Sequence, residues 1–77
     1  MANVNPDLAQ SQQAYVAAVD AWVAAIRKEE ALASQTNSIA QIDRWEKAHF
    51  DEEAERDKAK AAKKRFEDQL RERFFGF

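Results

Sequence analysis

Large apolar residues in the first half of the chain recur with the spacing of an amphipathic helix. Placed at 100° per residue, they fall within an arc of about 120°. This group consists of Leu8, Tyr15, Val16, Val19, Trp22, Val23 and Ile26. The opposite side carries a row of alanines, namely Ala14, Ala17, Ala18, Ala21, Ala24 and Ala25. A helix that is apolar nearly all round is expected to be buried nearly all round, which one partner helix cannot achieve.

Local signals place the ends of this first helix. Asn5 can cap free N–H groups and Pro6 suits the first helical position, so the helix is expected over about 6–33. A polar cluster of turn-forming residues follows at 34–38. Its last residue, Ser38, has a glutamine three positions later, a spacing that fits a capping box at the start of a second helix.

The second helix is expected over about 39–73, with an aromatic tail at 74–77. A short connection between two long helices makes them antiparallel neighbours. The sequence therefore predicts a single all-α domain, a two-helix antiparallel hairpin.

The second helix has apolar residues at its ends and charges in its middle. Ile42, Trp45 and Phe50 share a broad side near the turn, and Phe66, Leu70 and Phe74 form a patch at the far end. Between them, opposite charges recur at helical spacing and support a solvated helix. The expected pairs are Glu52–Arg56, Glu55–Lys58, Asp57–Lys60, Lys63–Glu67 and Lys64–Asp68.

Folding the hairpin at the turn predicts a mismatch between the two helices. Tyr15 falls opposite about Asp57, and the far-end patch reaches to or past the start of the first helix, where its own hairpin offers few contacts. Chains this short bury little surface, and a chain without cysteine has no disulfides to compensate. We therefore expect a homo-oligomer, with a homodimeric four-helix bundle as the simplest closed form. The expected interface residues are Tyr15, Val19, Trp22, Val23, Ile26, Phe66, Leu70 and Phe74.

One motif suggests a metal site as an alternative. Glu46-x-x-His49 places a carboxylate and an imidazole on one helical face, as in carboxylate-bridged di-iron and di-manganese bundles. In this short motif the chain resembles the encapsulated ferritins, and the resemblance implies an iron or manganese site with ferroxidase-like activity. Glu53 and Glu30 are the further ligand candidates. The favoured interpretation is that His49 is a half-buried packing residue and that no cofactor is bound.

A basic segment at 58–65 suggests a second alternative, binding of nucleic acid or another anionic partner. Its cations are Lys58, Lys60, Lys63, Lys64 and Arg65. They spread round the helix, acidic residues flank them, and the net charge of −2 opposes a polyanion. A salt-bridged, solvated helix is the favoured interpretation.

The remaining features restrict the function classes. A single histidine, no cysteine and no glycine-rich loop leave little material for an enzyme, so a non-enzymatic structural or protein-interaction role is expected. Phe74, Phe75 and Phe77 surround the lone Gly76 and can dock in the oligomer or anchor another protein. With neither a signal-peptide pattern nor a membrane-spanning run, a cytoplasmic protein is expected.

Overall fold

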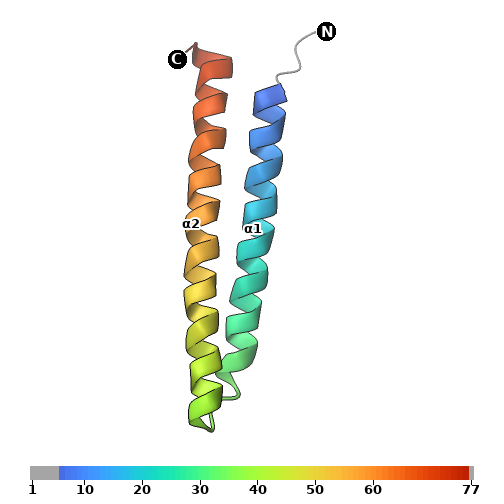
Figure 1. The fold of residues 1–77 in the computed structure, drawn as a ribbon. Helices are drawn as coiled ribbons and strands as arrows, with labels where there is room; N and C mark the ends of the chain where they lie inside the picture. The colour runs from blue at the N-terminus through green and yellow to red at the C-terminus, as the bar shows by residue number, and fades with distance from the viewer. Residues whose placement is uncertain (1–5, 77) are drawn as a thin grey trace.

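The computed structural model describes residues 6–76, which form a hairpin of two long helices (Figure 1). α1 spans Pro6–Ala33 and α2 spans Ile39–Phe75, and the described residues contain no strand. The helices run side by side in opposite directions, and α2 extends past the first turn of α1 at the end away from the connection. The Cα atoms occupy 59 × 21 × 12 Å, so the molecule is a slab one helix thick. The all-helical hairpin is confirmed.

The helix ends follow the expected signals. Ser38 adopts an extended conformation, and its Oγ accepts the N–H of Gln41 at 3.2 Å. In turn, Oε1 of the Gln41 side chain accepts the N–H of Asn37 at 2.8 Å, one residue earlier than in a standard capping box. Gly76 closes α2 in the left-handed conformation (φ 78°), and its N–H bonds to the carbonyl of Glu72. α2 thus runs two residues beyond 73, while the Asn5 cap and Phe77 lie outside the described residues.

The two helices meet along a narrow seam with a seven-residue repeat. Within each helix, the positions shielded by the other helix are spaced alternately three and four residues apart, as in a coiled coil. In α1 they are Leu8, Ser11, Tyr15, Ala18, Trp22, Ala25, Glu29 and Leu32. In α2 they are Gln41, Ala48, Glu52, Glu55, Ala59, Ala62, Phe66 and Gln69; the position between the first two is Trp45, which is 37% exposed. Residues seven apart therefore hold equivalent positions relative to the opposite helix.

Small and polar side chains fill much of this seam. The fully buried residues among those described are Ser11, Ala48 and Ala59, and Ser11 donates its hydroxyl to the carbonyl of Leu8 at 2.9 Å. Alanine lets helix backbones approach closely, but it contributes little apolar area. The hairpin consequently has no conventional core of large side chains.

The expected mismatch between the helices is wrong in part. Phe66 is half-buried and stacks on Tyr15, with ring centroids 5.8 Å apart, so its own hairpin does offer it a contact. Helical side chains lean toward their own N-termini, so Tyr15 contacts a residue well beyond Asp57. Trp22 of the large stripe does contact Glu52 in the charged middle of α2. Val23 and Ile26, however, lie beside the seam and are 42% and 40% exposed.

Candidate functional site

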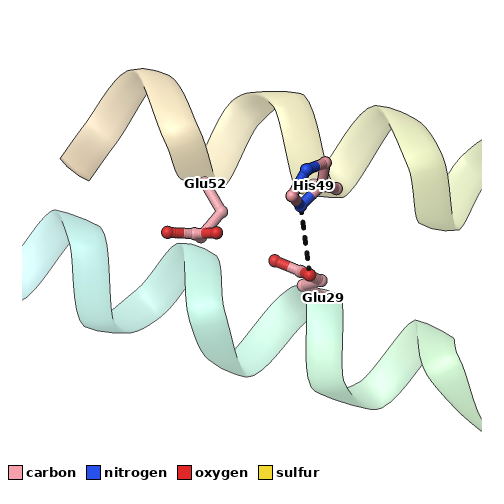
Figure 2. A group of neighbouring side chains, drawn as sticks. All are labelled: Glu29, His49 and Glu52. Carbon is pink, nitrogen blue, oxygen red and sulfur yellow. Dashed lines mark ion pairs between the residues drawn. The ribbon is translucent and has the colours of Figure 1, made fainter. Parts of the chain in front are cut away.

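The lone histidine lies between carboxylates from both helices (Figure 2). Glu29 of α1 approaches His49 of α2, with 3.5 Å between its Oε1 and Nδ1. Glu52, one turn further along α2, points toward α1 beside them. One ligand atom from each of the three lies within 4.8 Å of the others. Glu29 and Glu52 are half-buried, whereas His49 is exposed.

Each member of this cluster already has a partner. The Nε2 atom of His49 lies 2.6 Å from Oε1 of Glu53, so carboxylates face both ring nitrogens. The indole N–H of Trp22 donates to Oε2 of Glu52 at 2.7 Å. The Trp22–Glu52 and Glu29–His49 contacts both cross from one helix to the other. The arrangement therefore links the helices through polar contacts at a level where the seam has little apolar area.

As a metal centre, the cluster offers one imidazole and two carboxylates. Metal–ligand distances of about 2.0–2.2 Å would require the donor atoms to move closer than they are here. Glu53 could hold Nε2 in the way that outer carboxylates orient metal-bound histidines. The cluster could thus hold a divalent cation only with rearrangement of contacts that are already made.

The structure gives His49 different neighbours from those that the sequence suggested. Glu53 does contact the ring, but the cluster contains Glu29 and Glu52 rather than Glu30 and Glu46. Glu30 pairs with Arg27 at 3.6 Å on the exposed side of α1. The seven-residue seam could have identified the correct pair, since Glu29 follows Trp22 by seven residues and Glu52 precedes Ala59 by seven.

On the side of the seam toward which Glu29 and Glu52 are open, large apolar side chains form an exposed surface. We define the apolar face as Val16, Val19, Val23 and Ile26 of α1 with Ile42 and Trp45 of α2. Ile26 and Trp45 line one hollow of this face with Glu29 and Glu52, and Ile42 and Trp45 line the next toward the turn. Val19 occupies the position equivalent to Ile26, and Val16 the position equivalent to Val23. Val19 is half-buried; the other five side chains are between 37% and 53% exposed.

The opposite side of the seam is lined by alanine. A shallow groove runs between Ala21, Ala24 and Ala25 of α1 and Ala48 and Ala54 of α2. Its rims carry Lys28, Lys58, Asp51 and Glu55. We call this side the alanine face. The groove itself is lined by no large apolar side chain, and Leu32 borders a smaller hollow beside it toward the turn, so the two faces of the slab differ in character.

The basic segment lies on an exposed part of α2, whereas the far-end patch is exposed only in part. Lys58 pairs with Glu55 at 3.4 Å and Lys64 with Asp68 at 2.9 Å, which confirms two of the expected ion pairs. Phe74 and Phe75 are 68% and 70% exposed in the last turn of α2, with Leu70 half-buried beside them.

Over residues 6–76, neither helix is apolar enough along its length to cross a lipid bilayer. Comparison of the chain with protein-family models, with curated proteins and with solved structures found no match.

Proposed function

We propose that this protein is a self-assembling helical hairpin whose role is structural, and that two copies associate through the apolar face into a four-helix bundle. The observation that carries the proposal is the exposure of the largest aliphatic side chains along one face. Small and polar residues fill much of the seam instead, although Tyr15, Trp22 and Phe66 also lie in it. Covering a valine, isoleucine or tryptophan side chain typically contributes ~1.5–3 kcal/mol, so a surface with several of them favours a partner.

The dimensions of the slab support a second copy as that partner. A face of about 59 by 21 Å exceeds the ~800 Å² that each partner contributes to a standard protein interface. A pair of identical hairpins can close such a surface by a twofold axis, which leaves no apolar face exposed. The alanine faces then lie on the outside of the bundle.

Sedimentation velocity and native mass spectrometry of protein purified without chelator test this proposal. We expect a metal-free dimer for the unaltered chain. The Val23→Glu variant should be monomeric and less helical, because a carboxylate in the covered face would be desolvated without a partner. Ala17→Glu, on the exposed outer side of α1, is the matched control and should remain dimeric.

Two other outcomes would overturn the proposal. An unaltered chain that is monomeric and fully helical at a total protein concentration of about 100 µM would show that the apolar face does not bind a second copy. An iron or manganese mass increment that is lost in His49→Ala would instead support the metal-binding alternative.

A further inference from the structure

The border of the apolar face along α2 has an ordered sequence of charges. Because the seam repeats every seven residues, the series 42, 49, 56, 63, 70 and the series 46, 53, 60, 67, 74 each keep one position relative to α1. Read from the turn, this border begins with Ile42 and continues with an acidic segment of Glu46, His49 and Glu53. It continues with a basic segment of Arg56, Lys60 and Lys63, then Glu67, and ends with Leu70 and Phe74.

Two twofold arrangements can bring two apolar faces together. With the axis parallel to the helices, α1 of each copy lies against α2 of the other, with their turns at the same end. The stripe from Val16 to Ile26 would then lie against the charged border of the second copy at the same level. That level is fixed by the contacts of Trp22 with Glu52 and of Tyr15 with Phe66. Such a packing would cover carboxylates and ammonium groups with aliphatic side chains, which is unfavourable.

With the axis perpendicular to the helices, each helix lies against its own counterpart in the reverse direction. The aliphatic stripe of α1 is then its own partner: Val16 meets Ile26 of the second copy, and Val19 meets Val23. The centre of this stripe lies at residue 21, next to Trp22. Residue 21 lies between Tyr15, which contacts Phe66, and Trp22, which contacts Glu52. The level of α2 opposite residue 21 therefore lies between Glu52 and Phe66, close to residue 56.

Most charges of α2 are complementary about that same level. A reversal centred near residue 56 brings Glu53 against Lys60 of the second copy, and places Glu46 between Lys63 and Glu67. It also brings Ile42 against Leu70 at both ends of the bundle. Arg56 lies at the axis beside its own counterpart, which is a like-charge contact that opposes the pairing. This axis still matches the aliphatic stripe, the acidic and basic segments and the end patches better than the parallel axis does.

We propose that the two copies form an antiparallel homodimer, with the acidic segment of each α2 against the basic segment of the other. This inference rests on the proposed self-assembly and specifies its partner and orientation. It also gives a role to the carboxylates around His49, which would receive lysine side chains from the second copy as counterions rather than a metal ion.

Distances between spin labels, measured by pulsed electron paramagnetic resonance, distinguish the two arrangements. The chain has no cysteine, so Asp43→Cys near the turn and Asp57→Cys near the proposed axis each introduce a single labelling site. In the antiparallel dimer the two labels at 57 lie close together, whereas those at 43 are separated by ~40 Å along the bundle at 1.5 Å per residue. In the parallel dimer, both sites give similar short distances.

Each result has a separate meaning for the two proposals. A long distance at 43 with a short one at 57 supports the antiparallel dimer. Similar short distances at both sites would overturn this inference while leaving self-assembly intact. Absence of any intermolecular distance at either site would contradict self-assembly itself.

Charge exchange provides a second test. Glu53→Lys and Lys60→Glu should each raise the dissociation constant at low salt, by roughly two- to fivefold per exposed pair. The double variant should recover the original value, because the pair is restored with reversed signs. Additive weakening in the double variant would contradict the pairing.

Discussion

The seam and the apolar face lie side by side in this molecule, yet their side chains differ in character. The seam, which joins the helices, contains alanines and glutamates between a few large residues such as Tyr15, Trp22 and Phe66. The apolar face has the valines and isoleucines and is partly open to water. The large apolar residues of a two-helix chain therefore need not all mark the contact between its own helices. Side-chain size in the seam sets how closely the helices approach, while the area beside it is available for association.

Introducing a large residue into the seam should have the largest effect on the stability of the hairpin. Ala59 is 4% exposed, and Ala59→Leu should separate the helices and lower the free energy of unfolding by about 1–3 kcal/mol. Ala61→Leu, two residues along on the exposed side, should change it little. Chemical denaturation of both variants at equal protein concentration measures the difference. Equal stability of the two would mean that the seam tolerates large side chains.

The polar contact across the seam can be removed without changing its alanines. Trp22→Phe deletes the indole N–H that Glu52 accepts and leaves a half-buried carboxylate without that donor. We expect a loss of about 1–2 kcal/mol, since hydrogen bonds to charged groups are among the stronger ones but this one is partly exposed. Glu52→Gln keeps an oxygen acceptor and should cost less. A smaller loss for Trp22→Phe than for Glu52→Gln would contradict this account, and urea denaturation of both variants provides the test.

The turn joins the two helices, so weakening it should destabilise the seam and the apolar face equally. Ser38→Ala removes the acceptor for the N–H of Gln41 and should destabilise the hairpin by about 1 kcal/mol. Ser34→Ala is the control, because its hydroxyl bonds to a carbonyl within the last turn of α1 and caps no helix start. Thermal melts followed by circular dichroism should show the larger decrease for Ser38→Ala; the reverse order would contradict the capping role.

Asp68 lies on the outer surface of α2, away from the seam, so replacing it should change the stability of the hairpin least. Its hydrogen bond from Lys64 lowers the pKa of the carboxyl below the ordinary value of 3.8, and the charges of Lys64 and Arg71 act in the same direction. A carboxyl whose pKa is lower in the folded chain than in the unfolded chain stabilises the folded state when the pH is above its unfolded-state pKa. This contribution is lost as the pH falls through the folded-state pKa. Asp68→Asn should therefore lower stability slightly at pH 7 and make no difference once the carboxyl is protonated at low pH. A difference that persists at low pH would contradict the ionic origin, and melts at both pH values measure it.

Much of the fold could be predicted because its signals are local. Pro6 and the polar cluster at 34–38 mark the limits of the helices, and each signal depends on near neighbours. The side of each helix that meets the other was harder to predict. The apolar stripe includes Tyr15 and Trp22, which do lie in the seam, but hydrophobicity gives no reason for the seam to continue through Ala18, Ala25 and Glu29.

The candidate site shows the same limit. His49 stands out as the only histidine, and Glu53 lies one turn from it, so this pair could be found within one helix. Glu29 and Glu52 depend on the register between two helices, which the Glu-x-x-His spacing does not contain.

The thinness of the slab would make the state of this protein depend on its concentration. A layer whose Cα atoms span only 12 Å buries little apolar area by itself, so with the proposed dimer folding and association would become a single reaction. The folded fraction would then rise with the total protein concentration, and newly made copies at low abundance would remain open to proteases for longer. Expression level would then act as a threshold: below it the chain is degraded, and above it the chain accumulates.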